Sequence, residues 1–136
     1  MNKTIGFILA ACLLIVSAGC AQSNKQDSQT AKTEYRKISA EEAKQILDTN
    51  AQAILVDVRT EAEFKEQHIS GAILLPVAEI ENKAAEILPD KDATILVYCR
   101  SGVRSKTAAN QLISMGYTHV YDMGGIINWP YATEKN

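Results

Sequence analysis

The sequence is poor in the residues from which metal sites and disulfide networks are built. Its 136 residues include only three cysteines and two histidines, and their spacing matches no familiar metal cluster. Cys12 and Cys20 belong to the apolar N-terminal part, so Cys99 is the only cysteine in the rest of the chain. We therefore expect no disulfide within the folded domain, no metal and no cofactor.

A surplus of positive charge is also absent. The formal net charge is −2, from 14 basic and 16 acidic residues, and this balance does not favour a nucleic-acid partner. The length favours a single domain, and a hydrophobic content of 46% is enough for one core.

The N-terminal apolar run, residues 5–16, is too short to span a membrane comfortably. It follows a short basic start and precedes Ser17-Ala18-Gly19, which is the layout of a signal peptide. The small residues directly before Cys20 resemble a bacterial lipobox, with Ser17 where leucine is usual. We expect residues 1–19 to be a lipoprotein signal peptide. Cys20 is then expected to carry a lipid that anchors the protein to a membrane, on the extracytoplasmic side. A secreted or periplasmic protein, or an uncleaved anchor, is the alternative.

The segment after Cys20 is polar and has no apolar period up to residue 34. Such a composition cannot bury enough surface to fold, so we expect residues 20–34 to be a flexible tether. The folded domain is then expected over residues 35–136.

Apolar and amphipathic segments alternate along residues 35–136. Ser39 and Thr60 each have a glutamate three residues later, the spacing of a helix capping box. The expected strands are residues 35–38, 53–58, 72–75, 94–98 and 119–122, and the expected helices are residues 39–47, 60–67, 77–87 and 106–115, with a helical turn at 126–129. This alternation predicts an α/β fold with a central parallel sheet of about five strands and helices on both faces.

The stretch around Cys99 predicts a strand, a tight loop and a helix. Such a loop directs backbone N–H groups at whatever lies in its mouth, and the helix N-terminus adds partial positive charge. Both effects favour thiolate over thiol, and Arg100 and Arg104 add two full charges nearby. Cys99 is therefore a candidate nucleophile in an anion-binding loop at the carboxyl end of a strand, where ligands bind in such sheets. The structural alternative is a small, inert core cysteine.

Four segments together resemble the rhodanese-like domain family of sulfurtransferases, over residues 38 to 131. They are residues 56–59 with Glu63-Phe64, residues 68–72 with Pro76, residues 98–105 with Ala108-Ala109 and Leu112, and Gly116-Tyr117 followed by Gly124-Gly125 and Trp129. The resemblance implies a single α/β domain and a catalytic cysteine, which is Cys99 at the head of a six-residue loop ending at Arg104. Gln67 stands where many members have glycine, and we expect it to alter a turn rather than the chemistry.

The resemblance also implies a mechanism. Cys99 takes the outer sulfur of thiosulfate or a similar anionic donor, and its persulfide passes that sulfur to cyanide or a thiol, including a protein thiol. The anion-binding residues are then Arg100, Ser101, Gly102, Val103, Arg104 and Ser105. Arg100 is expected to attract the donor, whereas Arg104 either contacts the donor or pairs with Asp57. Asp57 and Arg59 are expected to support the loop through structural hydrogen bonds.

Other functions use related residues. A cysteine-dependent phosphatase or arsenate reductase places arginine six positions after the cysteine, where this chain has Ser105. A persulfide carrier that serves a partner protein shares the Cys99 chemistry, whereas a binding module of this family typically lacks the cysteine. We expect His68 to be a turn or core residue rather than a base, and Trp129 to pack the C-terminal turn. Tyr98 either lines the pocket or fills the core.

Overall fold

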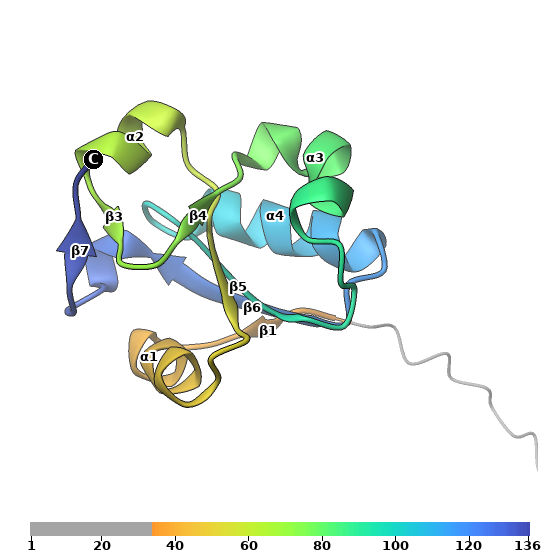
Figure 1. Cartoon of the computed structure of the whole chain (residues 1–136), viewed down its shortest axis with the longest axis horizontal. Coiled ribbons are helices and arrows are strands. Elements are labelled where there is room, and N and C mark those ends of the chain that lie inside the picture. Colours follow the sequence, from red (N-terminus) through yellow and green to blue (C-terminus); the bar gives the residue numbers. More distant parts are fainter. Residues whose placement is uncertain (1–33) are drawn as a thin grey trace, which may run out of the picture. The chain divides into compact units, whose positions relative to one another are not determined.

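The computed structural model describes residues 34–136 (Figure 1). The expected signal peptide, Cys20 and all of the expected tether except Glu34 lie outside the described residues. Within the described part, no helix combines the length and the hydrophobicity that crossing a membrane requires.

A five-stranded parallel sheet lies at the centre of the domain, as predicted. Its spatial order is β1-β6-β5-β2-β4. The strands are β1 (Arg36–Lys37), β2 (Ile54–Asp57), β4 (Ile73–Leu74), β5 (Thr94–Cys99) and β6 (His119–Gly125). Both central strands, β2 and β5, are nearly continuous apolar runs because each has side chains buried on both faces of the sheet.

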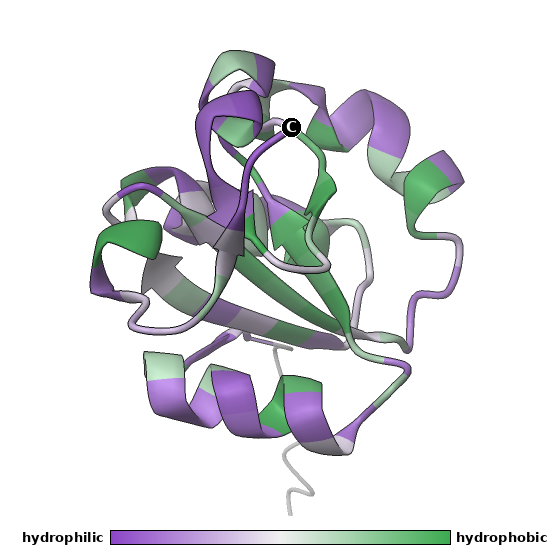
Figure 2. Ribbon diagram, turned by 60° about the vertical axis from the view of Figure 1, so that its left-hand side comes forward, coloured by the Kyte–Doolittle hydropathy of each residue, from purple (hydrophilic) through white to green (hydrophobic). Residues whose placement is uncertain are grey.

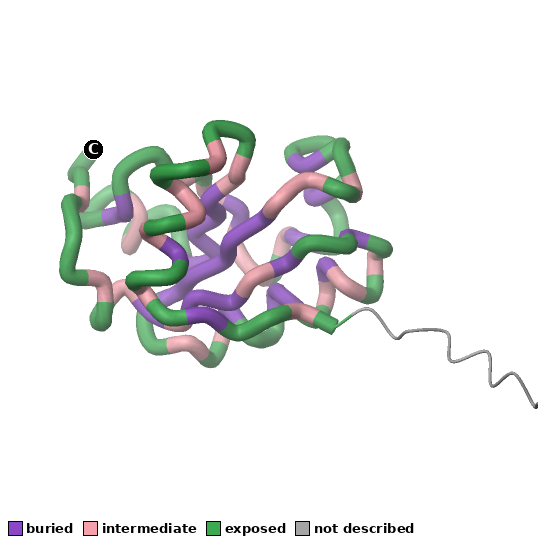
Figure 3. The backbone as a smooth tube through the Cα atoms, turned by 90° about the horizontal axis from the view of Figure 1, so that it is seen from below, coloured by how far each residue is buried: buried purple, intermediate pink, exposed green. Residues whose placement is uncertain are grey.

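Helices cover both faces of this sheet and divide the core into two clusters. Helix α1 (Ala40–Thr49) packs on one face, where Ala43 lies among Leu55, Leu96 and Met123. Helices α3 (Ile80–Ile87) and α4 (Val103–Ser114) pack on the other face (Figure 1). Figure 2 shows hydrophobic residues concentrated in the strands, and Figure 3 shows buried residues in the middle of the domain.

Both predicted capping boxes are present. Ser39 Oγ accepts from the Glu42 N–H, and the Glu42 carboxylate accepts from the Ser39 N–H, so α1 begins where the sequence predicts. Thr60 and Glu63 make the same exchange at the start of α2 (Glu61–Glu66). Each cap satisfies backbone donors that the first helical turn leaves free, an effect of about 1 kcal/mol.

Three boundaries differ from the predictions by three residues, and the others by at most two. Helix α4 begins at Val103 rather than Lys106, because Gly102 in a left-handed conformation turns the chain directly into the helix. A 3₁₀ turn, η1 (Val77–Glu79), precedes α3 where one helix was expected. Strand β6 continues through Gly124 to Gly125 instead of ending before them, because the chain pairs again with β5 beyond an irregularity in the ladder.

A second, two-stranded sheet was not predicted. Strand β3 (His68–Ile69) pairs antiparallel with β7 (Thr133–Glu134). Strands of two residues are too short to show an alternating pattern, and their partners lie far apart in the chain. The expected turn at residues 126–129 is present as the 3₁₀ helix η2 (Ile126–Asn128).

Candidate active site

Cys99 is the last residue of β5 and lies at the carboxyl end of the sheet. It is a free cysteine and only 1% exposed. The Gly102 N–H donates to Cys99 Sγ at 3.0 Å, so the loop folds back over the sulfur. Gly102 has a φ of +107°, a conformation that other residues adopt only with strain, and this angle allows the tight return.

The surroundings of Cys99 favour its thiolate. Burial alone would raise the pKa of this thiol, but hydrogen bonds from the backbone N–H groups of Ser105, Gly102 and Ser101 and from the Ser105 hydroxyl outweigh burial. The pKa of Cys99 is therefore lowered from its ordinary value. The loop thus combines a nucleophilic sulfur with several donors for an anion.

Ser105 and Gly125 fix the position of the loop against β6. The buried Ser105 hydroxyl lies within hydrogen-bonding distance of the carbonyl oxygens of Gly102 and Gly124, at 3.1 and 3.2 Å. A Cβ on Gly125 would lie 2.1 Å from the Arg100 carbonyl oxygen, so only glycine permits this close approach. The sequence indicated Gly125 as part of a segment that resembles the family, but its contact with the loop is a feature of the tertiary structure.

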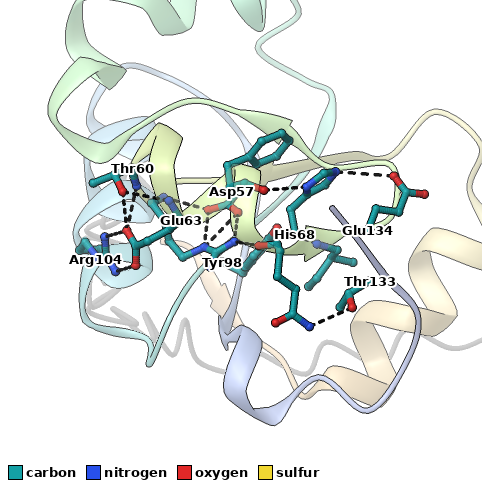
Figure 4. Close-up of polar contacts among 12 residues, drawn as sticks. Asp57, Thr60, Glu63, His68, Tyr98, Arg104, Thr133 and Glu134 are labelled. Carbon is teal, nitrogen blue, oxygen red and sulfur yellow. Dashed lines mark hydrogen bonds and ion pairs between the residues drawn. The ribbon is translucent and has the colours of Figure 1, made fainter. Parts of the chain in front are cut away.

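Arg104 does not pair with Asp57. Its two terminal guanidinium nitrogens donate to the two carboxylate oxygens of Glu63, at 2.7 and 2.8 Å (Figure 4). The Arg104 guanidinium lowers the pKa of the Glu63 carboxyl to about 2, against the opposing effect of burial. Glu63 therefore links two helix N-termini, because it also completes the capping box with Thr60. The sequence predicted only the capping role.

Asp57 instead pairs with Arg59. Arg59 Nε donates to the Asp57 carboxylate at 3.0 Å and Arg59 Nη2 donates to it at 2.6 Å, and both residues are buried. Arg59 Nη2 also donates to the carbonyl oxygen of Gln67 at 2.6 Å. The pair lies at the end of β2, the strand next to β5. Through the bond from Arg59 to Gln67, it joins β2 to the end of α2.

Tyr98 and His68 belong to the core around this pair. Tyr98 is fully buried, its hydroxyl accepts from the Ile69 N–H, and burial raises the pKa of that hydroxyl. His68 is buried and stacks on Phe64, while its Nδ1 lies 2.9 Å from the Phe64 carbonyl oxygen. His68 Nε2 lies 3.6 Å from the Glu134 carboxylate of β7 (Figure 4).

The remaining loop residues point outward. Ser101 is exposed, and Val103 is 74% exposed as the first residue of α4. Arg100 is exposed and lines a pocket beside the loop. The other lining residues of this pocket are Arg59, Glu63, Glu66, Gln67, Ile126, Ile127 and Lys135. In residues 34–136 no group of three or more His, Cys, Asp or Glu side chains is arranged to hold a metal ion.

Comparison with known proteins identifies this arrangement. The model of the rhodanese-like domain matches residues 39–130. The chain is 41% identical over 71 residues to the thiosulfate sulfurtransferase PspE of Escherichia coli K12, which covers 52% of this chain and 68% of that protein. It is 40% identical over 93 residues to a sulfurtransferase of Allochromatium vinosum, which covers 68% of this chain and 85% of that protein.

A solved structure has the same fold. The structure described as a rhodanese with anions from Escherichia coli superimposes with a TM-score of 0.59 at 36% identity, over 62% of this chain and 99% of that one. The fold and the site of residues 34–136 thus define an α/β domain with a cysteine-headed loop. The chain belongs to the rhodanese-like domain family, which is the family that the sequence motifs indicated.

Proposed function

We propose that this protein is a sulfurtransferase that moves sulfane sulfur from thiosulfate, or a similar anionic donor, to a thiol or cyanide through a persulfide on Cys99. The observation that carries the proposal is the set of donors around Cys99 Sγ, with the Gly102 N–H at 3.0 Å and the pKa of the thiol lowered. The sulfurtransferase names of its relatives support the same chemistry.

The first half-reaction is attack of the Cys99 thiolate on the outer sulfur of thiosulfate. A Cys–S–S bond forms, the S–S bond of thiosulfate breaks, and sulfite leaves with the electron pair of that bond. The persulfide carries one negative charge, as the thiolate did. The same N–H groups of Ser101, Gly102 and Ser105 therefore serve both states, and the site needs no proton transfer.

The second half-reaction restores the enzyme. Cyanide attacks the outer sulfur of the Cys99 persulfide, the S–S bond breaks, and the thiolate leaves as thiocyanate forms. A thiol acceptor gives a new persulfide in the same way. Because Cys99 is 1% exposed, an acceptor meets the added outer sulfur more readily than it meets Sγ itself.

The position of Arg104 favours sulfur transfer over phosphate or arsenate chemistry. A phosphatase loop of this kind uses an arginine to hold the oxyanion, whereas both terminal nitrogens of Arg104 are bound to Glu63. Arg104 then positions the loop, and Arg100 is the arginine that attracts the anionic sulfur donor.

The test is steady-state formation of thiocyanate from thiosulfate and cyanide by the full chain, with Cys99→Ser as control. Turnover that is lost in Cys99→Ser supports the proposal. Persulfide formation without turnover, with cyanide or with thiols, indicates a carrier that needs a protein acceptor. Turnover of phosphate esters in place of thiosulfate contradicts the proposal.

We also propose that the protein acts outside the cytoplasm, anchored to a membrane surface by a lipid on Cys20. The support is the signal-like start, the apolar run and the small residues before Cys20. Membrane fractionation of the expressing cells tests it: the protein is expected in the membrane fraction, and Cys20→Ser is expected to abolish lipidation. A full-length, lipid-free protein in the cytoplasm contradicts it.

A further inference from the structure

The pocket beside the Cys99 loop is lined by charged side chains that differ in whether they are already paired. The lining charges are Arg59, Glu63, Glu66, Arg100 and Lys135. Arg59 is neutralised by Asp57, and Glu63 by Arg104, in both cases through charge-assisted hydrogen bonds of 2.6 to 3.0 Å. These pairs form the wall of the pocket but leave little net charge for a ligand.

Three charges remain for a ligand. The side chains of Arg100, Lys135 and Glu66 form no ion pair or hydrogen bond with any other residue of the described range 34–136. Two positive charges and one negative charge leave the pocket with a net charge of +1. Arg100 directly follows Cys99 in the sequence and lines this pocket.

The backbone of Lys135 is held on both sides. Glu134, which precedes it, pairs with His68 in the β3–β7 sheet. The N–H of Asn136, which follows it, donates to the carbonyl oxygen of Lys65 in α2 at 3.2 Å. These contacts hold the backbone of Lys135, which lines the pocket and directly follows β7, the strand at the left of the domain in Figure 1.

Gln67 adds a further tie. Its Nε2 donates to Thr133 Oγ1 at 2.9 Å, which joins the end of α2 to β7 (Figure 4). The backbone of Gln67 is extended, with a φ of −168°, so the backbone alone does not require glycine or exclude it. A glycine at this position has no side chain to bond Thr133. Gln67 therefore lines the pocket and also ties the end of α2 to β7, the strand directly before Lys135.

We propose that Lys135 is a second residue that binds the sulfur donor. It holds the anionic end of the donor together with Arg100, whereas the negative charge of Glu66 weakens the binding of this anion. The proposal rests on the function proposed above and adds the charge selectivity of the donor site. A dianion such as thiosulfate gains twice as much from each lysine or arginine as a monoanion does. The pocket thus favours small, doubly charged sulfur anions over neutral or singly charged donors.

The test uses alkylation of Cys99 in the full chain, measured by mass spectrometry on the tryptic peptide of residues 92–100. Iodoacetate carries one negative charge and iodoacetamide none, so the ratio of their rate constants reports the electrostatic potential at the thiolate. Both reagents react with the thiolate alone, so the fraction of Cys99 that is ionised does not affect this ratio. At low ionic strength we expect Lys135→Gln to lower this ratio about two- to threefold. Glu66→Gln is expected to raise it by a similar factor, and Gln67→Gly to lower it by less than Lys135→Gln does.

The matched control is Lys83→Gln, which removes one positive charge from α3, far from β7 in Figure 1. It is expected to leave the ratio unchanged. In steady-state assays with the dianion thiosulfate, Lys135→Gln is expected to lower kcat/KM by about fivefold, the square of its effect on iodoacetate. Salt at 0.5 M is expected to remove most of each effect.

Two different failures are distinguishable. If wild type forms thiocyanate but Lys135→Gln has the alkylation ratio of wild type, the role of Lys135 is wrong and the proposed function stands. If the ratio falls as expected but wild type makes neither persulfide nor thiocyanate from thiosulfate, the anion pocket is supported and the proposed function fails, and with it the assignment of a sulfur donor.

Discussion

The ion pair between Glu63 and Arg104 makes a quantitative prediction for the variant Glu63→Gln. Glutamine at this position still completes the capping box with Thr60, so the change removes mainly the charge. A fall in the pKa of Glu63 from 4.5 to about 2 corresponds to about 3 kcal/mol of stability at neutral pH. Because the Glu63 and Arg104 side chains are 26% and 34% exposed, we expect about 2 kcal/mol after solvent screening.

The sign of the pH dependence follows from the lowered pKa. A carboxyl whose pKa is lower in the folded state stabilises the fold above its unfolded pKa and loses this effect as the pH falls through its folded pKa. The gap in unfolding free energy between wild type and Glu63→Gln is therefore expected to be constant above about pH 5 and to close between pH 4.5 and about 2.

Urea unfolding from pH 7 to pH 2.5 measures this gap. The matched control is Glu61→Gln on the same helix, whose ion pair with Lys65 is exposed, and we expect it to have little effect at any pH. A gap for Glu63→Gln that does not change with pH, or that equals the gap of Glu61→Gln, would show that the ion pair between Glu63 and Arg104 does not stabilise the fold.

Three further variants test how the loop is held. Gly125→Ala places a Cβ 2.1 Å from the Arg100 carbonyl oxygen, so we expect the loop to shift and the alkylation rate of Cys99 by iodoacetamide at pH 7 to change at least threefold. Ser105→Ala removes a hydroxyl that lowers the pKa of Cys99, so the pH profile of alkylation is expected to move to higher pH. Asp57→Asn leaves the buried Arg59 without its counter-ion, and urea unfolding is expected to show a loss of about 3–5 kcal/mol.

The parts of the fold that could be predicted are those determined by residues close together in the sequence. The capping boxes at Ser39 and Thr60 depend on residues three apart, and the buried strands show as apolar runs. The loop after Cys99 could be predicted because a strand, a glycine and a helix follow one another within a few residues. The alternation of apolar and amphipathic segments predicted the parallel sheet, and the family resemblance implied the same α/β domain.

The features that escaped prediction depend on residues far apart in the chain. The chain contains several carboxylates that could pair with Arg104. No local sequence pattern indicates that the partner is Glu63, which lies 41 residues away in the chain. The need for glycine at position 125 arises from the approach of Arg100, which only the folded sheet creates. Lys135 reaches the pocket because β7 pairs with β3, and neither strand is long enough to show a pattern.

In the proposed function, Cys99 carries the transferred sulfur as a persulfide. The most direct measurement is the mass of the Cys99 peptide, residues 92–100, before and after the full chain meets thiosulfate. We expect a gain of about 32 Da, one sulfur atom, that cyanide removes and that Cys99→Ser does not show. An unchanged mass with both thiosulfate and polysulfide, under conditions in which iodoacetamide still alkylates Cys99, would show that Cys99 does not carry sulfur.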